Sequence, residues 1–201
     1  MEYGVKMPRQ PKFSRDDVLD AARDAVFEHW RSATVSHVTS RLGAPSGSIY
    51  HRFASREALF VTAWIRSVRR FQQALTTIVE IPDPTEAIVE TALHIPRFCR
   101  QHRKDARMMT LYRHADLLTT APPELREELA GLNTPVATAI AALTRRRYGR
   151  VTNHGLAVMR LACRDSPYGI VRPIIGEAIP AWIDDAVRAT TGALAGLPDH
   201  T

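Results

Sequence analysis

The sequence predicts an all-α protein in which a three-helix N-terminal domain is joined to a larger helical bundle. Apolar residues recur at helical spacing along the 201 residues. Strand signals are poor, because neither a sustained alternation of apolar and polar residues nor an Asn-Gly or Asp-Gly turn occurs. The segment Ile81-Pro82-Asp83-Pro84 breaks the helical pattern and marks the predicted domain boundary.

The first helix is predicted over residues 15–30. Ser14 is a suitable N-cap with Asp17 three residues on, and Phe13 and Val18 can form a hydrophobic staple across the cap. The residues that follow at helical spacing form one apolar face, namely Val18, Leu19, Ala22, Val26 and Phe27.

Two short helices and one long helix are expected to follow. Thr34 can cap a second helix, which stops at Gly43. Pro45 suits the first turn of a third helix over 45–52, in which Ile49 points inward. Ser55 caps a fourth helix that the apolar pattern extends to about residue 80.

Five further helices are predicted beyond the break, over residues 86–100, 104–118, 122–143, 152–165 and 177–195. Pro96 is expected to kink the first of them, and Pro135 to bend or split the third. A stretch that contains Pro and Gly, residues 166–176, is expected to separate the last two.

Composition and charge narrow the class of protein. Apolar residues make up 45% and charged residues 24%, and no apolar run approaches the roughly 20 residues of a membrane span. The N-terminus has no apolar core of a secretory signal, so we expect a cytoplasmic protein. Of the net charge of +6, residues 1–80 hold +4, from 12 Lys and Arg against 8 Asp and Glu. This basic bias suggests a polyanionic partner.

Motifs of enzymes and metal sites are not evident. The two cysteines, Cys99 and Cys163, lack metal-ligand spacing and read as small apolar residues, with a redox-sensing pair as the alternative. The sequence has no Gly-rich phosphate loop, no Gly-x-Ser-x-Gly elbow and no His-Glu-x-x-His. We therefore expect no enzymatic activity, no metal and no cofactor.

Residues 34–53 point most directly to a function. Two short helices around a Gly-containing turn are the helix-turn-helix pattern, whose second helix lies in the DNA major groove. Ser46, Gly47 and Ser48 are small, so the backbone of that helix can approach base edges and the hydroxyls can hydrogen-bond to bases. Three larger side chains can reach phosphates, namely Tyr50, His51 and Arg52. Arg52 can equally be a solvated charge, and Phe53 is expected in the core.

The same region resembles the tetracycline-repressor-like (TetR) family of transcriptional regulators. The resemblance covers residues 13–64, and its most specific part is Gly-Ser-Ile-Tyr-His-Arg-Phe at 47–53 followed by Ser-Arg-Glu-Ala-Leu at 55–59. Ser46 departs from the family, which often has lysine there, and the connection between Phe27 and Val35 looks shorter than usual. The resemblance implies base contacts by Ser46, Gly47 and Ser48, and phosphate contacts by Thr34, Tyr50, His51 and Arg56.

The resemblance also implies how the chain is organised. We expect a flexible basic arm at 1–12, a helix-turn-helix DNA-binding domain at 13–55, a connecting helix at 56–80 and a helical effector-binding and dimerisation domain at 81–201. The implied function is a sequence-specific repressor, a homodimer that a small-molecule effector releases from a near-palindromic operator on double-stranded DNA. The alternatives are a DNA-organising protein of this fold that senses no small molecule, and a small helical enzyme.

Two sets of residues are candidates for the roles of the larger domain. A bundle interior can hold a small molecule, and the candidate effector-pocket residues are His94, Phe98, Met108, Met109, Tyr112 and His114, each of which can equally be ordinary core or surface. An apolar stripe on the last helix can pair with a second copy of the chain, and it consists of Ile179, Trp182, Ile183, Ala186, Val187 and Leu194. The alternative is that this stripe packs inside one subunit.

Overall fold

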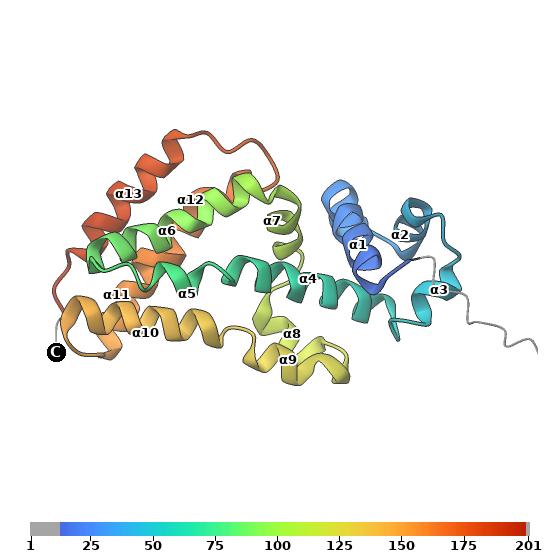
Figure 1. Ribbon diagram of the computed structural model, residues 1–201, viewed down its shortest axis with the longest axis horizontal. Helices are drawn as coiled ribbons and strands as arrows, with labels where there is room; N and C mark the ends of the chain where they lie inside the picture. The colour runs from blue at the N-terminus through green and yellow to red at the C-terminus, as the bar shows by residue number, and fades with distance from the viewer. Residues whose placement is uncertain (1–12, 200–201) are drawn as a thin grey trace, which may run out of the picture.

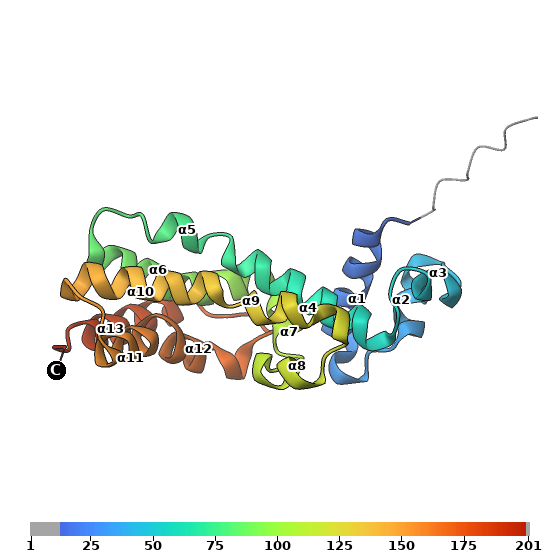
Figure 2. The same ribbon diagram turned by 90° about the horizontal axis from the view of Figure 1, so that it is seen from below.

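The regular structure of residues 13–199, the part of the chain that the computed structural model describes, is helical throughout (Figure 1), which confirms the all-α prediction. Three helices gather at one end of an elongated molecule, namely α1 (Arg15–His29), α2 (Val35–Leu42) and α3 (Ser46–Tyr50). From this end α4 (Arg56–Gln72) runs into a larger helical bundle, as Figures 1 and 2 both show. The basic arm predicted at residues 1–12 lies outside the described residues.

The bundle is formed by the remaining elements. Its α-helices are α5 (Leu75–Ile78), α6 (Pro84–Gln101), α7 (Arg103–Met109), α8 (His114–Thr120), α9 (Arg126–Gly131), α10 (Thr134–Tyr148), α11 (Asn153–Arg160), α12 (Ser166–Val171) and α13 (Trp182–Ala195). Within the bundle, short 3₁₀ turns occur at η2 (Pro123–Leu125) and η4 (Arg172–Ile174), and a π-helical turn occurs at η3 (Leu161–Asp165). A further 3₁₀ turn, η1 (Trp30–Ser32), follows α1 in the N-terminal domain. No helix within residues 13–199 is both long enough and apolar enough to cross a membrane.

The predicted caps of the N-terminal helices are confirmed. The Ser14 hydroxyl accepts the Asp17 N–H at 3.0 Å, and the Asp17 carboxylate accepts the Ser14 N–H at 2.8 Å. Thr34 and His37 form a matching pair at the start of α2. At the end of α2, Gly43 adopts φ 58°, the left-handed conformation that glycine tolerates best. Local capping chemistry therefore sets the ends of these helices.

Two predicted helices are split in the structure. The helix expected to reach residue 80 ends at Gln72, and α5 follows as a separate element. The helix expected over 104–118 divides into α7 and α8. At that break the Met109 carbonyl accepts a hydrogen bond from the Trp64 indole N–H at 3.0 Å, so it no longer needs a partner from its own helix. A side chain of α4 thus favours the end of α7.

The proline residues have different effects. The chain splits before Pro135, as predicted, and this proline lies in the first turn of α10. By contrast, α6 continues through Pro96. The break expected at 166–176 is also displaced, because α11, η3 and α12 form one continuous helix with Pro167 in the first turn of α12. The wider π-helical turn directly before Pro167 accommodates its ring and its missing N–H.

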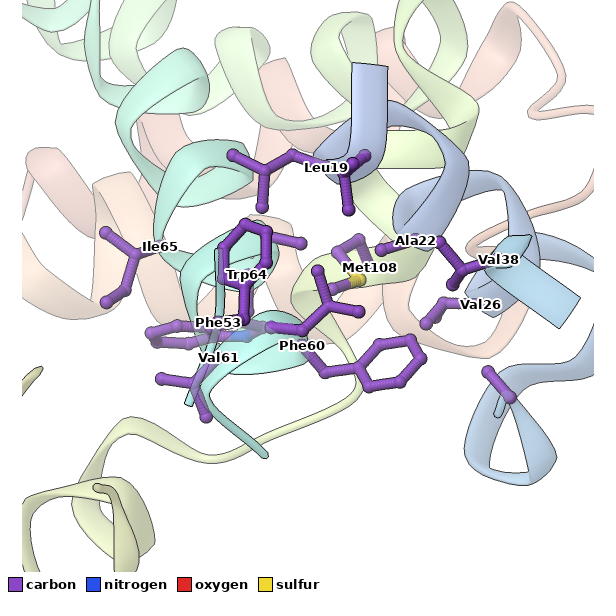
Figure 3. Close-up of a cluster of buried hydrophobic side chains, with 14 of the residues drawn as sticks. Leu19, Ala22, Val26, Val38, Phe53, Phe60, Val61, Trp64, Ile65 and Met108 are labelled. Carbon is purple, nitrogen blue, oxygen red and sulfur yellow. The ribbon is translucent and has the colours of Figure 1, made fainter. Parts of the chain in front are cut away.

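Three hydrophobic clusters hold the molecule together. The first joins α1–α4 to α7, α8 and α9, and Figure 3 shows some of its side chains, among them Met108 of α7, Phe60 and Val26. The second packs α6 against α12 and α13, and the third packs α6 against α10, α11 and η3. Because α7–α9 contribute to the first cluster, the packing around the helix-turn-helix extends well beyond the predicted domain boundary.

Candidate nucleic-acid interface and interior cavity

Helix α3 lies at one end of the molecule (Figure 2). Its one buried side chain is Ile49, which is 1% exposed and fixes the rotation of the helix. Ser46, Gly47 and Tyr50 are exposed, and a Cβ built on Gly47 would meet no heavy atom within 4 Å. Since His51 is exposed as well, the outer face of α3 is free to approach a partner as broad as a DNA groove.

Ser48, the third residue predicted to contact bases, is less accessible than Ser46 and Gly47, because it is half-buried. Its hydroxyl donates a hydrogen bond to the Pro45 carbonyl at 2.7 Å. That bond occupies the hydroxyl proton but leaves the oxygen able to accept. Thr34 is exposed at the start of α2, where its hydroxyl oxygen accepts the His37 N–H at 3.3 Å. Its hydroxyl proton can still be donated to an anion.

Arg52, which was predicted to reach phosphates or to be a solvated charge, braces the domain in the structure. Its guanidinium donates to the Ser48 carbonyl and to the Phe13 carbonyl, both at 2.8 Å, and the side chain is half-buried. The second bond joins the turn after α3 to Phe13, which precedes the N-cap residue of α1. Beside it, the Arg15 guanidinium carbon lies 5.1 Å from the centroid of the Phe53 ring, and Phe53 is buried as predicted.

Arg56 has a mixed role. It donates to the Ala33 carbonyl at 2.7 Å, and its guanidinium carbon lies 4.8 Å from the centroid of the Phe60 ring. Even so, 43% of its side chain is exposed. Arg56 therefore holds the residue next to Thr34 in place while part of the guanidinium stays accessible.

Helices α1 and α2 make contacts with each other that the sequence did not indicate. The rings of His29 and His37 are stacked with centroids 3.9 Å apart, and Arg41 pairs with Glu28. Trp30 adopts φ 45°, a conformation that non-glycine residues rarely adopt. Because such pairings join residues of different elements, the periodicity of either helix carries no signal for them.

Helix α7 links this domain to the bundle through buried charge. Asp105 is 3% exposed and accepts hydrogen bonds from the Ser67 hydroxyl and the Arg70 guanidinium of α4, both at 2.9 Å. The Arg23 guanidinium of α1 lies 3.6 Å from the same carboxylate. A second ion pair between α7 and α1 joins Lys104 to Asp24 at 2.7 Å. One short helix therefore holds both α1 and α4.

A cavity of about 720 Å³ lies in the bundle beside α7. Of the six predicted pocket residues, Phe98, Met109 and His114 line it, whereas the other three are absent from its walls. The remaining walls come largely from α4, α10 and α11, whose apolar stripes could not be distinguished from ordinary core in the sequence.

Met108, His94 and Tyr112, which were also predicted to line the pocket, are held by other contacts. Met108 is fully buried in the first cluster. The His94 ring nitrogen Nε2 lies 2.7 Å from the Phe71 carbonyl, and burial lowers the pKa of this histidine. Tyr112 packs against the first cluster, where burial raises the pKa of its hydroxyl well above the usual range.

The predicted dimer stripe is largely internal. Ile179, Ile183 and Val187 are 5%, 3% and 0% exposed, because α13 and the segment before it pack them against α6 and α12. Ala186 and Leu194 are half-buried. Trp182 alone among the predicted residues is widely exposed, at 63%. The stripe thus follows the alternative of packing within one subunit, and these three buried side chains are not available to a second copy.

A different set of apolar side chains is exposed on the same helices. Leu161 of η3, Tyr168 of α12 and Trp182 of α13 are 43%, 41% and 63% exposed. We refer to these three residues as the exposed apolar face. They lie on neighbouring helices, since α13 packs against both η3 and α12. Exposed apolar side chains on neighbouring helices are candidates for contact with a partner.

Comparisons with known proteins agree with this geometry. Residues 18–63 match the family model described as bacterial regulatory proteins, tetR family. The family consists of DNA-binding regulators and not of enzymes, which confirms the prediction that the chain is not an enzyme. No curated protein matches the chain.

Solved structures share the fold over most of the chain. A transcriptional regulator from Rhodococcus sp. Rha1 is 20% identical, with a TM-score of 0.72 over 90% of this chain and 96% of its own. The TetR family transcriptional regulator PfmR from Thermus thermophilus is 19% identical, with a TM-score of 0.70 over 88% and 96%. The regulator FadR from Bacillus subtilis, in complex with stearoyl-CoA, is 15% identical, with a TM-score of 0.60 over 90% and 96%.

Proposed function

We propose that this DNA-binding transcriptional regulator of the TetR family, whose residues 18–63 match the family model, is a repressor that a small molecule releases from its operator. The observation that carries the proposal is the placement of α7. Ala106 and Met109 of this helix line the cavity, while Asp105 and Lys104 approach α1 of the DNA-binding domain. A ligand and the DNA-binding domain would thus act on the same short helix.

The DNA-binding part of the proposal rests on the exposed face of α3. We assign base contacts to Ser46, Gly47 and Ser48. We assign phosphate contacts to Thr34, Tyr50, His51 and the exposed part of Arg56, but not to Arg52, since its guanidinium already serves two carbonyls. A regulator of operators works where the DNA is, so we assign the protein to the cytoplasm.

The effector part rests on the cavity. Its volume of about 720 Å³ suits a small organic molecule, for which sites of roughly 300–1,000 Å³ are typical. The Bacillus subtilis regulator FadR of the same fold has been solved with stearoyl-CoA, a ligand with a long apolar chain. Phe98, Met109 and His114 are the predicted residues that would contact a bound molecule.

We also propose a homodimer that pairs through the exposed apolar face. Leu161, Tyr168 and Trp182 would meet their own copies across a two-fold axis, which makes the surface self-complementary. Pairing at this end would carry two copies of α3 to a near-palindromic operator.

Selection of bound DNA from a random pool tests the proposal. We expect one near-palindromic sequence to be enriched, with competitor DNA unable to displace the protein from it at moderate salt. Equal binding to all sequences would instead favour the alternative of a DNA-organising protein. The Tyr50→Ala and His51→Ala variants should bind every sequence more weakly, and Ser48→Ala should change the preferred sequence.

A further inference from the structure

The cavity has apolar walls in its interior. Phe71 and Val68 of α4, Phe98 and Ile95 of α6, and Ile140 of α10 face it. Cys99 also lines it, and burial raises the pKa of its thiol to about 12, so this side chain is neutral at physiological pH. Walls of this composition favour a ligand with an uncharged, apolar body.

Three polar side chains that line the cavity already have partners in the protein. Gln72 donates to the Leu132 carbonyl at 2.8 Å, and the Thr110 hydroxyl donates to the Arg107 carbonyl at 2.8 Å. The His114 ring nitrogen Nε2 lies 2.8 Å from the Leu129 carbonyl. A ligand that carried polar groups along its body would lose hydration there and gain few hydrogen bonds in return.

The charged lining residues come from a single helix. Among residues 13–199 that line the cavity, the carboxylates and guanidinium groups are Arg160, Arg164 and Asp165, all on the continuous helix α11–η3–α12. Arg164 donates to its neighbour Asp165 at 2.6 Å. Arg160 makes no hydrogen bond or ion pair within the described chain. The rim of an apolar cavity thus carries one guanidinium without a counter-charge.

The π-helical turn explains how these residues share one wall. Four residues of an α-helix advance about 40° beyond a full turn, because the helix has 3.6 residues per turn. Four residues of the wider π-helix fall short of a full turn, so the two deviations offset each other. Arg160, Arg164 and Tyr168 are spaced by four residues across η3, and all three line the cavity. π-Helical turns of this kind often occur at functional sites.

We propose that the ligand of this cavity is an amphipathic anion whose apolar chain fills the interior and whose terminal acidic group binds Arg160, with Arg164 beside it. The proposal rests on the effector role proposed above and specifies the chemistry of that effector. A carboxylate or a phosphate monoester fits the guanidinium equally, since both accept paired N–H bonds from arginine. Asp165 limits the attraction, because its carboxylate neutralises Arg164 and repels an acidic group.

Direct binding to the purified full-length protein tests this proposal without DNA. The probes are dodecanoate, dodecyl phosphate and dodecanol, which share a chain and differ in their head groups. Binding is followed by calorimetry and by tryptophan fluorescence, since Trp64 lines the cavity. We expect both anions to bind at least about tenfold more tightly than the alcohol, as a charge-assisted hydrogen bond implies. Preference for one anion then identifies the acidic group.

Three variants separate a role in binding from a role in structure. Arg160→Ala should abolish the preference for anions, Arg160→Lys should restore part of it, and Asp165→Asn should strengthen anion binding several-fold by freeing Arg164. Arg172→Ala is the matched control, because Arg172 is exposed on the same stretch of chain and does not line the cavity. Circular dichroism on each sample verifies that the variants are folded.

The outcomes distinguish this inference from the proposed function. Equal affinity for dodecanol and the anions, or an anion preference that survives Arg160→Ala, overturns the inference. Failure of saturated carboxylates from octanoate to stearate to bind overturns it as well. If the anions bind through Arg160 yet leave operator affinity unchanged, the ligand class stands and the effector role proposed for the cavity fails. If a neutral compound alone occupies the cavity and releases DNA, the repressor stands and this inference fails.

Discussion

Arg52 offers a sharp test of how the DNA-binding domain is assembled. Replacing it with alanine removes two charged hydrogen bonds, to the Ser48 and Phe13 carbonyls. Each such bond stabilises a protein by roughly 1.5–3 kcal/mol, but both carbonyls can turn to water once the guanidinium is gone. We therefore expect a loss of about 2 kcal/mol, which lowers the melting temperature by about 5 °C in a chain of this length.

The salt dependence of DNA binding distinguishes a brace from a phosphate contact. A lost phosphate contact flattens the slope of log affinity against log salt by about one unit. As a brace, Arg52→Ala should weaken operator binding without changing this slope, because the same number of phosphates is neutralised. His51→Ala is the control, since His51 is exposed and its loss should leave the melting temperature unchanged. A flatter slope together with an unchanged melting temperature would refute the brace.

Three further predictions concern the bundle. Trp182→Glu should give a folded monomer in sedimentation experiments, because Trp182 is 63% exposed. Val187→Glu should instead unfold the subunit, because Val187 is 0% exposed. A Trp182→Glu protein that stays dimeric would exclude the exposed apolar face as the dimer interface. Asp105→Asn should lower the free energy of unfolding by about 3 kcal/mol, as measured by urea denaturation, because it leaves a buried ion-pair network incomplete. A change within experimental error would show that Asp105 does not stabilise the packing of α7. Burial lowers the pKa of His94 in the folded protein, so the free energy of unfolding should be highest above the unfolded pKa of 6.5 and should decline as the pH falls below that value. His94→Gln should reduce this decline. An unchanged dependence of stability on pH in that variant would exclude His94 as its source.

Features set by neighbouring residues could be predicted from the sequence. Ser14 and Thr34 begin their helices, and Gly43 ends one, at the positions that capping rules predict, because a cap depends on residues within one turn. The inward position of Ile49 and the burial of Phe53 follow from the same local pattern. These elements fix the orientation of α3, which explains why the exposure of residues such as Gly47 and Tyr50 could be predicted.

Features set by distant residues could not be predicted in this way. Periodicity shows that Val187 is buried but not whether α6 or a second subunit covers it. The guanidinium of Arg52 has the reach to contact a phosphate or a carbonyl, and only the folded position of Phe13 decides between them. The cavity likewise depends on how several helices pack against one another. The apolar pattern of a single helix does not show whether its side chains fill the core or line a cavity.

Because α7 is a single helix, the cavity and the DNA-binding domain lie close enough to be coupled through it. Met109 on this helix faces the cavity, while Asp105 lies within 3.6 Å of the Arg23 guanidinium on α1. Only the thickness of one helix, about 10 Å, separates the two contacts. Thermodynamic reciprocity then requires that a ligand which weakens operator binding by some factor is itself bound more weakly, by the same factor, when the operator is occupied. Operator DNA would thus act as a competitor of a molecule that it never touches.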